Sequence, residues 1–137
     1  MEIKIIKNQP LKIKDIEKLY TENKWSAINK PQQLIEGLNN SHTLLYAQKD
    51  NTVVGLANAI SDGALVVYFP HLLVLPKFQK LGIGKMLMDE MSNIYHGFHM
   101  QMLVADHDAV DFYKKIGFKK AGQTTCLLYT SPSPRDA

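Results

Sequence analysis

Apolar and polar residues follow two different periods along this chain, and the changes of period predict its elements. A short strand over residues 3–6 comes first. Apolar residues then recur at helical spacing over 13–20, and Pro31 suits the first turn of a second, short helix. The chain therefore opens with one strand and two amphipathic helices.

The pattern then changes to that of strands. Residues 44–47 and 53–60 flank a short polar turn, which predicts an antiparallel hairpin. An almost continuous apolar run follows over 65–75, and such a run is typical of a strand in the centre of a sheet. Pro70 lies within it and cannot donate a hydrogen bond to a neighbouring strand. We therefore expect a bend or bulge at Pro70 and His71.

The rest of the chain predicts two more helices, each followed by a strand. The strongest helical pattern covers 83–94, and it is followed by a strand over 100–105, a helix over 109–116 and a last strand over 123–130. Gly117 is suited to close the second of these helices. The mixed order of elements predicts an α/β, or α+β, sheet with helices on both faces.

Length and composition fit a single domain over residues 1–130. The chain has 137 residues, of which 45% are hydrophobic and 21% charged, as is ordinary for a globular protein. The tail over 131–137 has two prolines and no apolar side chain suited to packing, so we expect it to be disordered. It also resembles translated adaptor or vector sequence, which favours a non-native tail.

Charge and cysteine content narrow the expected partners and the compartment. The net charge of +3 comes from scattered lysines, a weak basis for a nucleic-acid surface but compatible with an anionic cofactor. Cys126 is the only cysteine, so no internal disulfide can form and a reducing cytosol fits best. No secretory signal or membrane span is recognisable, so we expect a cytoplasmic protein without a nucleic-acid or membrane partner.

A glycine pair lies where the long apolar run gives way to the strongest helix. The segment is Gln79-Lys80-Leu81-Gly82-Ile83-Gly84, and the glycines allow the N–H groups of 81–85 to face an anion such as a pyrophosphate. A tight turn without a ligand is the alternative interpretation. A Walker loop does not fit, because Met86 stands where a hydroxyl is needed, and the dinucleotide fingerprint lacks its third glycine.

Two motifs make the sequence resemble the GNAT acyltransferase superfamily. Gln79, Gly82 and Gly84 match its signature Gln/Arg-x-x-Gly-x-Gly/Ala, and residues 109–118 are similar to its second hallmark, Ala-x-x-Phe-Tyr-x-x-x-Gly-Phe. The resemblance implies a mixed sheet of about six to seven strands flanked by about four helices. It also implies that the fourth and fifth strands splay apart.

The resemblance further implies acetyl-coenzyme A (acetyl-CoA) as co-substrate. We expect no metal ion, because His96, His99 and His107 lack partners at a metal-ligating spacing. The pantetheine arm would lie between the splayed strands and the pyrophosphate at the glycine loop. The implied contacts are Leu73, Val74, Leu75, Gln79, Lys80, Leu81, Gly82, Ile83, Gly84, Lys85, Asp106 and Tyr113. Asp106 stands where many relatives have asparagine, and we expect it to cap or start the following helix together with Asp108.

Acetyl transfer to an amine moves two protons, one off the ammonium group and one onto the leaving thiolate. Tyr113 matches the family tyrosine that often protonates the sulfur, and packing beside Phe112 is its alternative role. His71 stands where relatives commonly have Asp or Glu. A histidine ordinarily titrates at about pH 6.5, which suits a general base, and a merely lining histidine is the alternative.

The resemblance to the GNAT superfamily also implies that the acceptor would lie among the first two helices, their connection and the ends of the central strands. Trp25, Tyr46 and Tyr68 offer aromatic contacts there, and Asp62 offers an acid for an ammonium group, with completion of the core as the alternative for the aromatic side chains. A small-molecule primary amine attacking directly in a ternary complex is the leading hypothesis. A protein or peptide amine, a silent acyl-CoA-binding sensor and a small basic interaction module are the alternatives. A homodimer is compatible with each.

Overall fold

The computed structural model describes residues 2–129; Met1 and residues 130–137, which include the expected tail, lie outside the described residues. The strands are β1 (Lys4–Lys7), β2 (Thr43–Lys49), β3 (Thr52–Ser61), β4 (Val66–Tyr68), β5 (Leu72–Val74) and β6 (Met100–Met102). The helices are α1 (Ile13–Glu22), α2 (Pro31–Asn39), α3 (Ile83–Ile94) and α4 (Val110–Lys115), with 3₁₀ turns η1 (Ser26–Asn29), η2 (Pro76–Phe78) and η3 (His107–Ala109). Within 2–129, no helix is long and apolar enough to cross a membrane.

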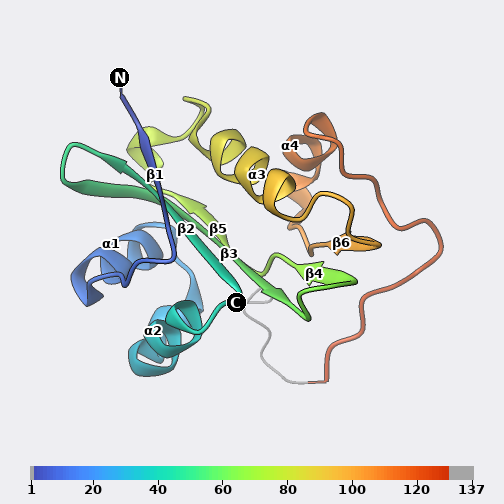
Figure 1. The fold of residues 1–137 in the computed structure, drawn as a ribbon. Coiled ribbons are helices and arrows are strands. Elements are labelled where there is room, and N and C mark those ends of the chain that lie inside the picture. Colours follow the sequence, from blue (N-terminus) through green and yellow to red (C-terminus); the bar gives the residue numbers. More distant parts are fainter. Residues whose placement is uncertain (1, 130–137) are drawn as a thin grey trace.

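The six strands form one mixed sheet, as predicted. β1, β2 and β3 are successive antiparallel neighbours, and β4 and β5 both pair antiparallel with β3 at different positions along it. β6 runs parallel to β4. In Figure 1, α1 and α2 lie on one side of this sheet and α3 lies on the other. The mixed sheet with helices on both faces is therefore confirmed.

The predicted long strand over 65–75 is interrupted, and the expected bend at Pro70 and His71 is confirmed. Pro70 has no N–H, and Asn58 of β3 bridges the break instead of a regular ladder. The Asn58 N–H donates to the His71 carbonyl at 3.2 Å, and the Asn58 Oδ1 accepts the His71 N–H at 3.0 Å. Among the described strands, β6 pairs only with β4 and β5 pairs only with β3. The pair formed by β4 and β6 is therefore not hydrogen-bonded to β5, and the sheet splits at the break between β4 and β5.

The core confirms the helical periodicity read from the sequence. Side chains at three- and four-residue spacing are buried against the sheet, namely Ile16, Leu19 and Tyr20 of α1, Leu34 and Leu38 of α2, and Ile83, Leu87, Met88 and Met91 of α3. Gly55 allows α3 to approach β3, because a Cβ at this position would lie 3.1 Å from Ile83 Cγ2. This approach sets the position of the first turn of α3.

The predicted last strand over 123–130 is wrong for the part that the structure describes. Residues 123–129 form no strand, and the side chains of Leu127 and Tyr129 are fully or almost fully exposed. Alternation of apolar residues indicates a strand only where a neighbouring strand can supply hydrogen bonds and packing. No such neighbour lies beside this segment among the described residues, so the apolar pattern stays unsatisfied.

Candidate active site

The glycine loop joins η2 to α3 and leaves the first turn of α3 open. Gly82 precedes the helix with a φ of 88°, and Lys80 also lies in the left-handed region with a φ of 65°. The first N–H groups of a helix have no acceptor within it, and no side-chain hydrogen bond caps this end. These donors and the helix dipole favour an anion at the loop.

Gly84 brings the two sequence motifs into contact. A Cβ on Gly84 would lie 3.3 Å from Cζ of Phe112 and 3.9 Å from Cδ2 of Leu72. The absence of a side chain therefore lets the Phe112 ring lie directly against the first turn of α3. The glycine signature and the aromatic hallmark form one packed unit.

The end of α4 fixes the position of Tyr113. The Phe118 N–H donates to the Tyr113 carbonyl at 3.0 Å and the Gly117 N–H to the Lys114 carbonyl at 3.1 Å, while Gly117 has a φ of 110°. This is a Schellman motif, which places the residue after the glycine against the preceding helical turn. The rings of Tyr113 and Phe118 accordingly lie 5.9 Å apart, edge to face. The Gly-Phe pair of the second hallmark thus holds the tyrosine ring.

In β5, the backbone N–H and carbonyl groups of alternate residues point toward β3. Leu75 donates its N–H to the Val54 carbonyl at 2.9 Å. Alternate residues of an antiparallel strand face the same neighbour, so Leu73 also faces β3, whereas Leu72 and Val74 face away from it. The expectation that Leu73, Val74 and Leu75 all present their backbone to a ligand is therefore corrected to Leu72 and Val74.

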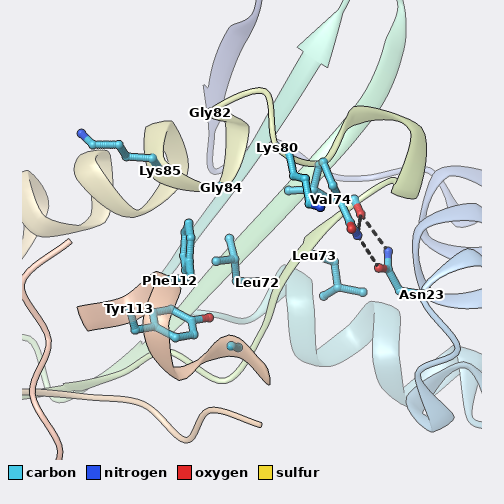
Figure 2. A pocket seen from close by; sticks show the side chains of 12 residues that line it. Asn23, Leu72, Leu73, Val74, Lys80, Gly82, Gly84, Lys85, Phe112 and Tyr113 are labelled. Atoms are coloured by element: carbon cyan, nitrogen blue, oxygen red, sulfur yellow. Dashed lines mark hydrogen bonds between the residues drawn. The ribbon is translucent and has the colours of Figure 1, made fainter. Parts of the chain in front are cut away.

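These elements enclose a cavity of about 370 Å³, which we call the glycine-loop cleft (Figure 2). Figure 2 shows Phe112, Tyr113 and Leu72 below the loop and Asn23 beside Val74. The cleft is lined by Asn23, Leu72, Leu73, Val74, Gln79, Lys80, Gly82, Gly84, Lys85, Ala109, Phe112 and Tyr113. It gathers most of the residues predicted to hold a cofactor, from three separate stretches of the chain, and adds Asn23 from a fourth.

Four predicted contacts do not line this cleft. Leu75 and Ile83 are core residues, and Leu81 and Asp106 are exposed. The Asp106 carbonyl accepts the Ala109 N–H at 2.8 Å, but its side chain makes no capping hydrogen bond. Asp106 therefore starts the helix through its backbone rather than by the expected side-chain cap.

Asn23 closes the cleft from the end of α1, a role that no pattern in the sequence indicates. Its Nδ2 donates to the carbonyls of Leu19, at 2.9 Å, and Val74, at 3.1 Å. The signature residue Gln79 donates from Nε2 to the same Val74 carbonyl at 3.1 Å and to Asn23 Oδ1 at 3.3 Å. Asparagine after a helix is a common cap, but only the fold places this one against β5.

His71 lies at the strand break, among aromatic side chains. Its Nδ1 lies 2.6 Å from the Tyr20 hydroxyl, and its ring centroid lies 5.0 Å from that of Trp25. Burial raises the pKa of the Tyr20 phenol, so this group stays protonated at physiological pH. The Tyr20 contact and the Trp25 ring restrain the orientation of the imidazole.

A second cavity of about 300 Å³ begins at His71, and we call it the α2 pocket. It is lined by Ala27, Lys30, Gln33, Leu34, Gly37, Leu38, Asn58, Ile60, Pro70 and His71. Pro70 and His71 belong to this pocket, while the next residue, Leu72, lines the glycine-loop cleft. The two cavities are therefore lined by successive residues of the chain at the break in the central strand.

Comparison with known proteins agrees with this geometry. Residues 11–127 match the model of the acetyltransferase (GNAT) domain. The chain belongs to the GNAT acetyltransferase family. A protein of Gracilaria tenuistipitata var. liui, called uncharacterized N-acetyltransferase ycf52, is 31% identical over 118 residues, which cover 81% of this chain and 64% of that protein. The chain thus spans less than two thirds of this relative.

Solved structures share the GNAT fold. A GNAT family acetyltransferase from Streptococcus pneumoniae TIGR4 superposes with a TM-score of 0.82 and 28% identity, over 96% of this chain and all of that one (100%). The aminoglycoside N-acetyltransferase AAC(6')-Iy, solved in complex with CoA, has a TM-score of 0.71 and 15% identity, over 96% of each chain. The second likeness concerns the fold alone.

The residues predicted for the acceptor of this GNAT domain do not gather in one place. Trp25 packs beside the strand break, whereas Tyr46 on β2 and Tyr68 on β4 line neither cavity. The Asp62 carboxylate accepts the backbone N–H groups of 64–66 in the turn between β3 and β4, and these hydrogen bonds lower its pKa. The Asp62 carboxylate therefore stabilises the turn between β3 and β4. Asp62, the acid expected to bind an ammonium group, lines neither cavity.

Proposed function

We propose that this GNAT domain transfers an acetyl group from acetyl-CoA to a primary amine of a small molecule, by direct attack in a ternary complex. The observation that carries the proposal is the glycine-loop cleft, which combines an open helix start, the outward edge of β5 and Tyr113. Lys80 and Lys85 line the same cleft and add positive charge. Such a cleft suits an elongated ligand with an anionic end.

The donor side fits acetyl-CoA in charge and in hydrogen bonding. The pyrophosphate would bind the first N–H groups of α3 and the two lysines, although Lys85 also pairs with Asp89 at 2.6 Å. The amide groups of the pantetheine arm would bind the outward backbone of Leu72 and Val74. Because the Val74 carbonyl already accepts two side-chain donors, its N–H is the group offered there. Bound acetyl-CoA supplies the thioester.

Tyr113 is our proposed general acid for the departing sulfur. It lines the cleft that would hold the thioester, and its ring is held by Phe112 and Phe118, 5.1 Å and 5.9 Å away between centroids. A positioned acid or base contributes about 10²- to 10⁴-fold to a rate. The phenol would donate its proton as the carbon–sulfur bond breaks.

His71 is our proposed general base, acting from the α2 pocket. Its Nε2 can accept a proton from the acceptor ammonium only when Nδ1 carries a hydrogen and donates it to the Tyr20 hydroxyl. In the other neutral tautomer the Tyr20 hydroxyl donates to Nδ1 and Nε2 carries the hydrogen. His71 would then orient the acceptor as a hydrogen-bond donor, without removing its proton.

The proposal includes no metal ion. Within residues 2–129, no group of three or more His, Cys, Asp or Glu side chains is placed to hold one. Both proton transfers are assigned to side chains that line the two cavities, so a metal has no step to perform here. Activity that survives prolonged treatment with a chelator is the expected result.

Acetyl-CoA titration and thiol release test the proposal directly. We expect saturable binding of acetyl-CoA, and free thiol and N-acetylated product appearing in equal amounts when an acceptor amine is present. Lys80→Glu should weaken binding, whereas the same charge reversal at Lys7, exposed on the edge strand β1, should not. Binding without thiol release across small amines and peptides would favour the sensor. Salt-dependent nucleic-acid binding without acetyl-CoA binding would favour an interaction module.

A further inference from the structure

The α2 pocket has a composition that restricts the acceptor. It lies between α2, η1, the end of β3 and the strand break, and it opens beside His71. Its volume of about 300 Å³ is at the lower end of ligand pockets, which run from about 300 to 1,000 Å³. A pocket of this size suits a small acceptor and not an extended oligosaccharide.

The charge of the pocket disfavours a polycation. Among the described residues, the lining contains one basic side chain, that of Lys30 at the start of α2. It contains no Asp or Glu side chain. Glu36 is exposed on α2 outside the lining, and Asp62 is engaged in its turn. A second ammonium group on the ligand would find no carboxylate and would be repelled by Lys30, whereas a carboxylate would be attracted.

The walls of the pocket are largely apolar. Leu34, Leu38 and Pro70 line the pocket, but Leu34 and Leu38 are already buried at 7% and 1% exposed, whereas Ile60 is 56% exposed. An apolar side chain of the ligand would cover the exposed part of Ile60 and remove it from water. His71 and Asn58 form a polar part of the lining, and His71 is followed in the chain by Leu72 of the glycine-loop cleft.

We propose that the acceptor is an apolar α-amino acid, with its amine at His71, its carboxylate toward Lys30 and its side chain against Leu34, Leu38 and Ile60. The inference rests on the proposed acetyl transfer and names the substrate class of that site. Transfer would form the bond between the acetyl carbon and the amine nitrogen as the bond to sulfur breaks. One ammonium proton would leave through His71 before the attack. Tyr113 would protonate the departing thiolate, and the second proton lost by the attacking nitrogen would restore the Tyr113 phenol.

Thiol release with matched amines tests the proposal. The full chain is assayed with acetyl-CoA and one of four amines. L-Leucine is the expected acceptor, leucinamide lacks its carboxylate, and glycine lacks its apolar side chain. Spermidine is a polycation. We expect kcat/KM to be highest for L-leucine and about tenfold or more lower for each of the others, since a hydrogen bond to a charged group or one buried methylene gives about a tenfold difference or more. A higher value for spermidine overturns the proposal and leaves the acetyl transfer standing.

Two variants test whether the carboxylate of the acceptor contacts Lys30. Lys30→Glu should lower kcat/KM for L-leucine about tenfold and leave that for leucinamide unchanged or higher. Lys14→Glu makes the same charge change on an exposed residue of α1, and both values should stay as in the parent. An unchanged ratio of L-leucine to leucinamide in Lys30→Glu overturns the assignment.

Calorimetric binding separates this inference from the proposed function. L-Leucine is titrated into the full chain saturated with CoA, a measurement that needs no turnover. Binding that Lys30→Glu weakens supports the proposed pocket even if no amine releases thiol, an outcome that would refute acetyl transfer. The absence of L-leucine binding, or binding that Lys30→Glu does not change, overturns the inference whatever the rate assay shows.

Discussion

The buried hydroxyl of Tyr20 and the Nδ1 atom of His71 lie 2.6 Å apart, where the central strand is interrupted. Because Tyr20 lines neither cavity, it is a positioning residue that acts through His71. The bond joins the core of α1 to the polar end of the α2 pocket. Loss of this hydrogen bond should therefore affect both the free energy of unfolding and the proton transfer proposed for His71.

Tyr20→Phe removes this hydrogen bond without leaving a cavity. We expect a loss of about 1 kcal/mol in the free energy of unfolding, a fall in kcat of severalfold and a shifted acidic limb of the pH–rate profile, with KM for acetyl-CoA unchanged. Tyr95→Phe is the control away from both cavities, since Tyr95 is buried and its hydroxyl is hydrogen-bonded to Thr43 at 2.6 Å and to His42 at 2.7 Å. It should lose at least as much stability and keep its kcat. A parental pH profile in Tyr20→Phe would remove the bond from the mechanism.

Tyr113→Phe tests the general acid. Without the phenol the departing thiolate lacks its proton donor, so we expect kcat to fall about 10²-fold while acetyl-CoA binding, measured by calorimetry, stays within about twofold. Tyr129→Phe, at an exposed residue, should leave both quantities unchanged. Equal kcat in the parent and in Tyr113→Phe would restrict Tyr113 to packing against Phe112 and Phe118.

Gly82→Ala tests the cradle at the start of α3. Alanine is strained at a φ of 88°, by about 1–2 kcal/mol, so the loop should shift and KM for acetyl-CoA should rise severalfold. Gly97→Ala is an unusually close control, because Gly97 has a φ of 87° and neither glycine has an atom within 4 Å of an added Cβ. Both variants should lose similar stability, and only Gly82→Ala should change KM. Equal KM values in the two would argue against an anion site at the loop.

Asp62→Asn tests the turn between β3 and β4 through its pH dependence. Folding lowers the pKa of Asp62 below its ordinary value of 3.8, mainly through hydrogen bonds from the N–H groups of Ala64, Leu65 and Val66. Its charge therefore stabilises the fold at neutral pH, and this contribution is lost as the pH falls below 3.8 and through the lowered pKa. Asparagine keeps an acceptor but does not titrate, so the variant should lose stability less steeply in acid.

Urea unfolding at a series of pH values between neutrality and pH 3 measures this difference. Asp50→Asn makes the same change of net charge in the turn between β2 and β3, beside Lys49 at 3.8 Å, and is the control for the loss of one negative charge. The KM for the acceptor amine should be unchanged in Asp62→Asn. A raised KM would restore Asp62 to the acceptor site and would count against the α2 pocket.

Local sequence signals were sufficient for much of the fold and for the two motifs that pack together at the glycine-loop cleft. Helical periodicity placed α1 and α3, Pro31 marked the start of α2, and Pro70 marked the break in the central strand. The glycine signature and the Phe-Tyr hallmark depend on residues close together in sequence. Backbone conformation and helix capping are themselves local, so such patterns determine them reliably.

Only the tertiary structure decided which groups meet in the cavities. Strand pairing turned the backbone of Leu73 and Leu75 toward β3 and that of Leu72 and Val74 away from it, and packing brought Asn23 to the end of β5. The turn after β3 took the Asp62 carboxylate out of the acceptor site. Within residues 2–129, no strand pairs with the apolar segment over 123–129. Each outcome depends on contacts between distant parts of the chain, which the local period of apolar residues does not specify.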